Sequence, residues 1–192
     1  MTYPKILALG DSLTAGYGLP AHCSFAAQLE TLLRERHPHA TVLNAGISGD
    51  TSAGGLARLP RLLSRLPTPP DLAIVELGAN DLLRGVAPER MRANLDAILT
   101  ELDRCGVPAL LAGMLAPPIL GGYARRYNAV FPALAQAHGA ALYPFFLDGV
   151  VGDPTLTLAD GVHPNARAVG IVARRILPHV EAALAASVRD AA

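Results

Sequence analysis

Residues 5–12 read KILALGDS, an apolar run that ends abruptly in a glycine, an acid and a hydroxyl. A short apolar run without polar alternation is typical of a strand in a parallel sheet whose two faces are both covered. Ligand sites in such sheets lie beyond the carboxyl ends of the strands. The stretch therefore predicts a buried first strand whose tip presents Asp11 and Ser12 at the functional edge of the sheet.

Strand and helix patterns alternate five times along the rest of the chain. This alternation predicts an α/β fold, a three-layer α/β/α arrangement around a five-stranded parallel sheet. We expect strands at residues 5–9, 40–44, 72–77, 109–115 and 140–143, and helices at residues 25–36, about 56–66, 88 to about 105, 123–138, and 164 to about 186.

The composition favours a single domain over residues 1–192 and excludes several classes of partner. The chain is 51% apolar, and 16 basic residues balance 16 acidic residues. A chain without a basic surplus is not expected to bind nucleic acid. Two isolated cysteines, Cys23 and Cys105, predict buried free thiols rather than a disulfide framework or a structural metal site.

Membrane insertion is not expected either. The longest apolar stretch, residues 107–120, is too short and too rich in proline to span a bilayer. No secretion signal precedes the first strand, so we expect a cytoplasmic protein, or a periplasmic or secreted one if a leader has been removed. The sequence leaves a homo-oligomer open.

Ser12 lies where a strand is expected to turn into a helix, in the stretch GDSLTAG at residues 10–16. A serine at such a turn has an exposed hydroxyl, and its N–H lies near a helix N-terminus, where negative charge is favoured. This geometry suits a nucleophile, although Asp11 or Ser12 acting only as a helix cap is the simpler alternative. The nucleophile motif GxSxG occurs nowhere in the chain.

The stretch DGVHP at residues 160–164 places a carboxylate three residues before a histidine. Asp160 can accept a hydrogen bond from one imidazole nitrogen of His163, which leaves the other nitrogen free to act as a general base. The alternative is a loop histidine without a chemical role.

Two further stretches, NAGISGDTS at residues 44–52 and LGANDLLRG at residues 77–85, follow the second and third expected strands. Acyl transfer needs uncharged hydrogen-bond donors near the tetrahedral oxygen, and a glycine N–H or an asparagine amide serves well. Gly49 and Asn80 are the candidates, and the alternatives are an ordinary turn glycine and turn asparagine.

Together, these four stretches resemble, in order and approximate spacing, the four conserved blocks of the GDSL or SGNH hydrolases. The similarity extends to residues 55–63, 125–135 and 143–150 and is closest to the bacterial arylesterase, thioesterase and lysophospholipase subgroup. The resemblance implies the flavodoxin-like SGNH hydrolase fold and a flexible loop at about residues 78–84. It also implies that no metal or other cofactor takes part.

The same resemblance implies a role for each site residue. Ser12 is the implied nucleophile, His163 the general base and Asp160 its orienting partner. The implied oxyanion hole consists of the Ser12 N–H, the Gly49 N–H and the Asn80 amide, with Gly49 rather than Gly46 as the donor of its block. Asp11 is expected to hold the turn by hydrogen bonding.

The expected function is a serine esterase that acts on a small-molecule ester through an acyl-enzyme on Ser12. Residues 115–123 resemble the arylesterase branch, so short-chain acyl or aryl esters come first, followed by thioesters, lysophospholipids and finally acetylated sugars. The main alternative is an acyl-CoA thioesterase or lysophospholipase. A non-catalytic binding module and a metal-dependent phosphatase are more remote, the latter with ligands from Asp11, Asp50, Asp81, Asp160 and His163.

Overall fold

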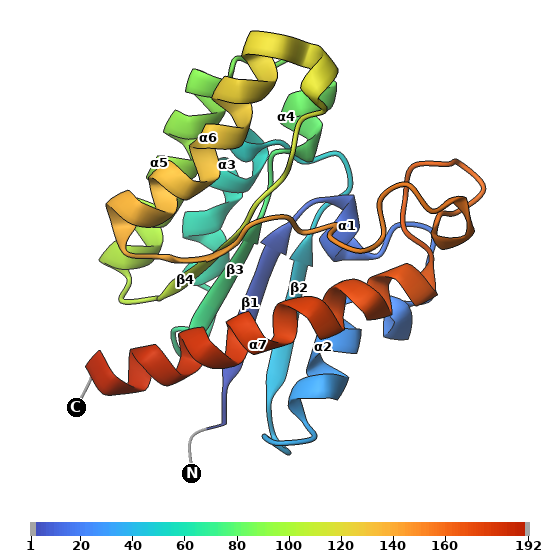
Figure 1. The fold of residues 1–192 in the computed structure, drawn as a ribbon. Helices are drawn as coiled ribbons and strands as arrows, with labels where there is room; N and C mark the ends of the chain where they lie inside the picture. Colours follow the sequence, from blue (N-terminus) through green and yellow to red (C-terminus); the bar gives the residue numbers. More distant parts are fainter. Residues whose placement is uncertain (1–2, 191–192) are drawn as a thin grey trace.

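The fold is built on a parallel sheet of five strands in the order β2-β1-β3-β4-β5 (Figure 1). It is seen in a computed structural model that describes residues 3–190. The strands are β1 (Lys5–Gly10), β2 (Thr41–Gly46), β3 (Leu72–Glu76), β4 (Ala109–Ala112) and β5 (Ala141–Tyr143). This strand order is that of flavodoxin-like folds, in which the order reverses beside β1. All five predicted strands are confirmed.

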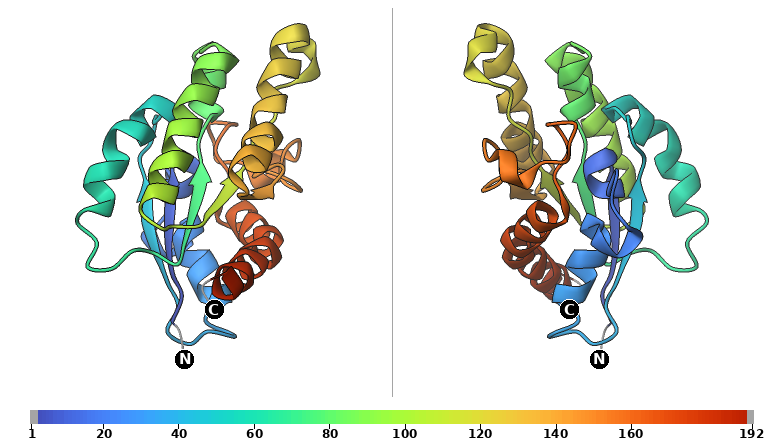
Figure 2. Two further views of the ribbon diagram at one scale, coloured as in Figure 1. Left: turned by 90° about the vertical axis from the view of Figure 1, so that its left-hand side faces the viewer. Right: turned by 90° about the vertical axis from the view of Figure 1, so that its right-hand side faces the viewer.

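Two layers of helices cover the sheet (Figure 2). On one face lie α2 (Phe25–Leu33) and α7 (Ala166–Asp190), and on the other lie α3 (Ser52–Leu63), α5 (Pro88–Arg104) and α6 (Gly121–His138). β1 and β3 lie at the centre of the sheet, and most of their side chains are buried. The predicted three-layer α/β/α architecture is therefore confirmed.

Several predicted element ends are displaced, each for a local reason. β4 ends at Ala112 instead of residue 115, since its pairing with β5 ends at Tyr143 and the Gly113 carbonyl then accepts from the Phe146 N–H in the loop after β5. The last helix begins at Ala166 rather than Pro164. Pro164 forms a bridge with Thr157, and the carboxamide of Asn165 accepts from Ala168 N–H and caps the helix.

Short helices line the carboxyl edge of the sheet and the loops near it. They are α1 (Ser12–Ala15), α4 (Ala79–Leu83) and three 3-10 turns, η1 (Ala21–Cys23), η2 (Pro118–Leu120) and η3 (Pro154–Leu156). α4 occupies the segment that was expected to be a flexible loop. Gly78 permits this helix, since it turns the chain with a φ of 123° directly before it.

Cys23 and Cys105 are free, as expected, but both thiols are half-buried rather than buried. Among residues 3–190, no helix is both long and apolar enough to cross a membrane. The location of the protein in the cell stays a prediction.

Candidate active site

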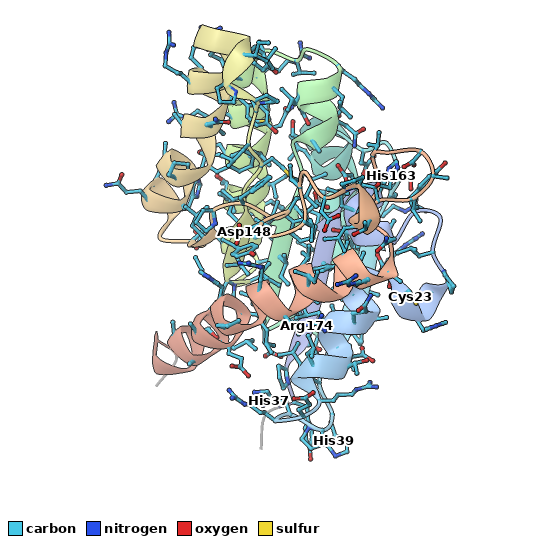
Figure 3. All side chains as sticks on the ribbon, turned by 45° about the vertical axis from the view of Figure 1, so that its right-hand side comes forward. Cys23, His37, His39, Asp148, His163 and Arg174 are labelled. Atoms are coloured by element: carbon cyan, nitrogen blue, oxygen red, sulfur yellow. The ribbon has the colours of Figure 1, made fainter. Side chains whose placement is uncertain are left out.

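Ser12 and His163 meet although 151 positions separate them in the chain. Ser12 is the first residue of α1, at the tip of β1, and His163 lies in the loop that precedes α7. The His163 Nε2 lies 3.0 Å from the Ser12 Oγ, and its Nδ1 lies 2.7 Å from the Asp160 Oδ2. Figure 3 shows His163 at the end of the molecule opposite His37 and His39. The fold thus brings the three predicted residues into one hydrogen-bonded chain.

The charge of Asp160 fixes the tautomer of His163. Hydrogen bonds from the Val162 and His163 backbone N–H groups, with the His163 ring, lower the pKa of Asp160 to about 2. An ionised carboxylate can only accept, so the His163 Nδ1 carries the hydrogen. In the neutral ring Nε2 is then an acceptor, and it can take the proton of the Ser12 hydroxyl.

Asp11 caps the helix that Ser12 begins. Its Oδ1 accepts from Leu13 N–H at 2.9 Å, which confirms the expectation that it holds the turn. The cap interpretation is therefore correct for Asp11, and it is compatible with a chemical role for Ser12. Burial raises the pKa of Asp11 to about 6, so that it is a carboxylate at neutral pH.

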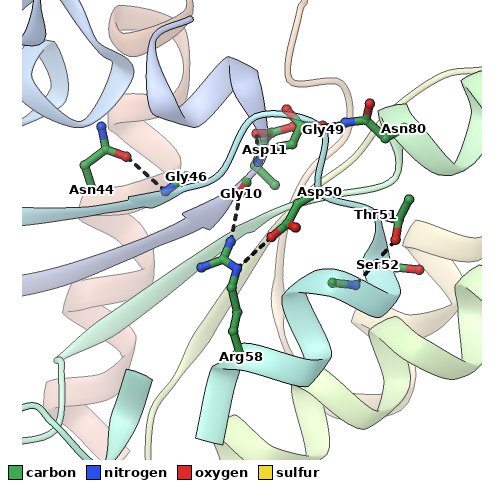
Figure 4. Close-up of polar contacts among 12 residues, drawn as sticks. Gly10, Asp11, Asn44, Gly46, Gly49, Asp50, Thr51, Ser52, Arg58 and Asn80 are labelled. Carbon is green, nitrogen blue, oxygen red and sulfur yellow. Dashed lines mark hydrogen bonds and ion pairs between the residues drawn. The ribbon is translucent and has the colours of Figure 1, made fainter. Parts of the chain in front are cut away.

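The second oxygen of Asp11 contacts the third predicted site residue. The Asn80 Nδ2 donates to the Asp11 Oδ2 at 2.8 Å (Figure 4). An amide nitrogen carries two hydrogens, so one of them is free for a further acceptor. Asp11 thus fixes the orientation of the amide that is implied in the oxyanion hole.

Gly49 and Gly46 differ in whether their N–H groups are free. Gly46 donates to the side chain of Asn44 at 3.0 Å, whereas no acceptor for Gly49 N–H occurs among residues 3–190. Gly49 has a φ of 85° in the turn after β2, and the Arg84 Nη2 donates to its carbonyl at 2.7 Å. This bond links the Gly49 turn to the end of α4, the helix that carries Asn80. The geometry favours Gly49 over Gly46 as a donor.

Buried polar contacts that the sequence did not reveal hold these loops. Asp81 is buried and accepts from the N–H and hydroxyl of Ser52 at 2.7 and 2.6 Å, and Asn94 donates to the same hydroxyl. α4 is thereby tied to the beginning of α3. Arg58 pairs with Asp50 at 2.6 Å and donates to the Gly10 carbonyl (Figure 4).

An aromatic ring packs beside His163. The ring centroid of Tyr17 lies 4.4 Å from that of His163, with 34° between the planes. Tyr17 is half exposed, so it shields one face of the imidazole while remaining in contact with solvent. The sequence did not predict this contact, because the position of Tyr17 directly after the GDSL stretch does not indicate which residue its ring will contact.

Among the acidic residues that the structure describes, Asp50 and Asp81 contact a basic and a hydroxyl side chain rather than one another. In the part of the chain that the structure describes, no group of three or more His, Cys, Asp or Glu side chains is arranged to hold a metal ion. Asp50 and Asp81 are engaged with Arg58 and Ser52 instead. The donor set expected for a metal-dependent phosphatase is therefore not gathered at this edge.

Comparison with known proteins agrees with this arrangement. The sequence profile of the GDSL-like lipase/acylhydrolase family matches residues 8–169. An arylesterase of Vibrio mimicus is 39% identical over 184 residues, which cover 92% of this chain and 90% of the relative. Thioesterase 1/protease 1/lysophospholipase L1 of Escherichia coli K12 is 40% identical over 172 residues, covering 88% of this chain and 79% of the relative.

A solved structure is similar over nearly the whole chain. The crystal structure of AlinE4, an SGNH-hydrolase family esterase, superposes with a TM-score of 0.80 at 49% identity. The match covers 96% of this chain and 98% of the esterase.

Proposed function

The chain belongs to the GDSL-like lipase/acylhydrolase family, and from that premise we propose how its residues hydrolyse an ester. The activity is that of a serine ester hydrolase. The proposal concerns the residues that perform it and the esters they accept. The observation that carries it is the chain of hydrogen bonds from Ser12 through His163 to Asp160.

In the first step Ser12 attacks the ester carbonyl carbon. The Oγ–C bond forms while the His163 Nε2 takes the hydroxyl proton, and the carbonyl π electrons move onto oxygen. Collapse of this tetrahedral species breaks the bond to the alkoxy or aryloxy group, which leaves with the proton from His163. An acyl group remains on Ser12.

In the second step water repeats the same sequence. His163 takes a proton from water as its oxygen bonds to the acyl carbon, and collapse returns the proton to the Ser12 Oγ. The products are a carboxylic acid and an alcohol, and the enzyme is regenerated. The negative charge of Asp160 stabilises the imidazolium in both steps.

We propose that three donors, each located just after a different strand, bind the oxyanion. They are the N–H of Ser12, the N–H of Gly49 and the second amide hydrogen of Asn80. The two backbone donors have no acceptor among residues 3–190, which supports their availability. Uncharged donors held in place before the reaction stabilise charge that develops only in the transition state.

Exposed apolar side chains in the segments that follow the carboxyl ends of the strands support an ester with an apolar acyl or aryl group. They include Tyr17, Ile47, Leu83, Leu115, Ile119 and Val162. Short-chain acyl and aryl esters are the proposed substrates, with thioesters and lysophospholipids next.

A chain-length series of p-nitrophenyl esters, measured beside an acyl-CoA and a lysophospholipid, tests the proposal. We expect the highest kcat/KM for a short-chain p-nitrophenyl ester, and no turnover of any substrate by folded Ser12→Ala. Higher kcat/KM for the acyl-CoA or the lysophospholipid would make the thioesterase or lysophospholipase activity the principal one. Retention of most activity by Ser12→Ala would exclude the mechanism.

We further propose that the chain works without a cofactor or a nucleic-acid partner and forms one domain. The mechanism above needs no cofactor, the balanced charge speaks against a nucleic-acid partner, and a hydrophobic core that extends from β1 to α7 supports a single domain.

A further inference from the structure

Glu76 is a fully buried acid at the end of β3, the central strand beside β1. Its Oε2 accepts from the Thr14 hydroxyl at 2.8 Å and from the Asp11 N–H at 3.3 Å. Its Oε1 has no hydrogen-bond partner in residues 3–190. A side chain this polar is rare at such a position, since the rest of the strand is apolar.

Within the described residues, no basic side chain forms an ion pair with Glu76. Arg58, which reaches the end of the neighbouring β1, is engaged with Asp50 and the Gly10 carbonyl. A buried carboxylate without a partner is very unfavourable, so such a group keeps its proton instead. Burial, followed by the charge of Asp11, raises the pKa of Glu76 well above its usual range.

Glu76 holds the turn on which Ser12 lies. Its two donors, Asp11 N–H and the Thr14 hydroxyl, are on either side of Ser12. The glycine at position 10 allows the Thr14 hydroxyl and the Glu76 carboxyl to approach each other, because a Cβ there would overlap both groups. The chain of contacts continues from Asp11 to the Asn80 amide at 2.8 Å.

We propose that Glu76 is a positioning residue that acts as a neutral carboxylic acid. It fixes the turn of residues 10–14, and it leaves the single negative charge of the pair on Asp11, where that charge orients the Asn80 amide. The proposal rests on the proposed function for its catalytic consequence. Its statement about the proton on Glu76 is independent of activity.

Other titratable groups act on this pair, and most of them through Asp11. His163 lowers the pKa of Asp11 and Asp50 raises it. On the α6 side, burial raises the pKa of Tyr127, with smaller contributions from Asp81, Tyr123, Glu76 and Asp11, so the phenol stays neutral. Within residues 3–190, Asp11 is therefore the one charged group that acts directly on the pKa of Glu76.

The pH dependence of unfolding tests the protonation state. Native Glu76 keeps its proton above pH 4.5, the ordinary value, whereas the unfolded chain releases it. Stability therefore falls as pH rises in the wild type, but Glu76→Gln lacks this contribution. Above pH 4.5 we expect the unfolding constant of the wild type to rise with pH relative to that of Glu76→Gln, by up to about tenfold per pH unit for as long as native Glu76 keeps its proton.

Urea unfolding of both proteins in a Ser12→Ala background gives this measurement without reference to catalysis. If the two unfolding constants depended on pH in the same way, the proposal that native Glu76 is protonated would be contradicted. If Ser12→Ala itself kept its esterase activity, the proposed function would fail while this result still stood. The two failures are therefore distinguishable.

Enzyme kinetics at pH 7.5 test the positioning role. Glu76→Gln keeps an acceptor for Thr14 and Asp11, so its kcat should stay within about threefold of the wild type. Glu76→Leu removes that acceptor. Since small misplacements of reacting groups are costly, its kcat should fall roughly tenfold or more with KM changed less than about twofold.

Thr14→Val removes the hydrogen bond from the Thr14 hydroxyl to Glu76. This variant tests the positioning role if Glu76→Leu does not fold. Its kcat should fall with KM retained, and Thr14→Ser should restore it. An unchanged kcat in folded Glu76→Leu, or in Thr14→Val, would contradict the positioning role. A loss in Glu76→Gln as large as that in Glu76→Leu would show instead that the ionised acid is needed.

Discussion

Asn80 combines a hydrogen bond that fixes its amide with a second hydrogen that remains free for the substrate. Replacement by alanine removes that donor, and we expect kcat to fall on the order of 10²–10³-fold, as for other single oxyanion donors. The free energy of unfolding should fall by no more than about 1–3 kcal/mol, the cost of leaving the Asp11 Oδ2 without its Asn80 donor.

Asn44→Ala is the matched control for Asn80→Ala. Asn44 lies on β2, and its amide contacts the Ala15 carbonyl and Gly46 N–H instead. Its kcat should stay within about threefold of the wild type, as expected for a polar contact away from the reacting atoms. Equal losses in the two variants, measured with a p-nitrophenyl ester, would remove Asn80 from the oxyanion hole.

Asp160 is expected to act as a fixed negative charge throughout the working pH range. Its pKa of about 2 lies below its ordinary 3.8 because backbone N–H groups and His163 donate to it. Asp160→Asn should lower kcat for a p-nitrophenyl ester by roughly 10²–10⁴-fold at pH 7.5. A kcat within about threefold of the wild type would show that the charge of Asp160 is not needed.

The same lowered pKa has a consequence for acid stability. A carboxyl group whose pKa is lower in the folded protein stabilises the fold above pH 3.8, and this contribution is lost as pH falls towards 2. The stability difference between the wild type and Asp160→Asn should therefore shrink over that interval. Urea unfolding at pH 2.5, 3.5 and 5 measures it.

At the level of single residues, the sequence predicted the proposed nucleophile and base, the orienting Asp160 and the Asp11 that holds the turn, but not the contacts of Glu76 and Tyr17. Ser12, Asp160 and His163 lie in short motifs that indicate their chemistry from the sequence alone. Glu76 was visible as an acid within the apolar run LAIVEL, but its partners come from a different strand and turn. Tyr17 gave no signal, because stacking on His163 depends on the tertiary fold.

At the level of elements, the contact between α3 and α4 sets the position of Asn80. Ser52→Ala leaves one oxygen of Asp81 and the amide of Asn94 without their hydroxyl partner. We expect a loss of about 1–3 kcal/mol in the free energy of unfolding, the usual cost of leaving buried polar groups unpaired.

Ser64→Ala provides the control, since this hydroxyl is exposed and contacts only the Arg61 carbonyl within the same segment. It should change stability by no more than about 0.5 kcal/mol. Urea denaturation of both variants tests this, and indistinguishable midpoints would mean that the contact between α3 and α4 adds no stability.

The periodic elements were predicted better than their ends. Apolar runs and helical stripes identified every long helix and strand, because burial imposes those patterns on the sequence. Tertiary hydrogen bonds set several ends instead: β4 stops where Gly113 bonds to Tyr143, and α7 starts after the Asn165 cap. α4 went unpredicted since a five-residue helix is too short to show a period.

At the level of the whole molecule, the fold places the chemistry at one edge of the sheet. The alternation of elements predicted a parallel sheet, but the order β2-β1-β3-β4-β5 is a property of how the strands pair and became visible only in three dimensions. A cavity of about 860 Å³ lies at the opposite edge, where Pro4, Asp71 and Pro108 precede their strands. The network around Ser12 therefore identifies the site, whereas cavity volume does not.

The distribution of acids over the molecule predicts independence from metal ions. Within residues 3–190 no cluster of three potential ligands exists. EDTA at millimolar concentration should leave kcat and KM for a p-nitrophenyl ester unchanged, and added Mg²⁺ or Mn²⁺ should not increase either. Inactivation by the chelator with recovery on adding metal would favour a metal-dependent mechanism.

The most direct test of the central claim is covalent labelling of Ser12 by an alkyl fluorophosphonate, followed by peptide mass spectrometry. An activated serine displaces fluoride and keeps the phosphonyl group, so one adduct should form on the peptide that contains Ser12. Ser12→Ala should not label, and His163→Ala should label at least about 10²-fold more slowly, because the base is gone. Labelling at another residue, or an undiminished rate in His163→Ala, would contradict the Ser12–His163 mechanism.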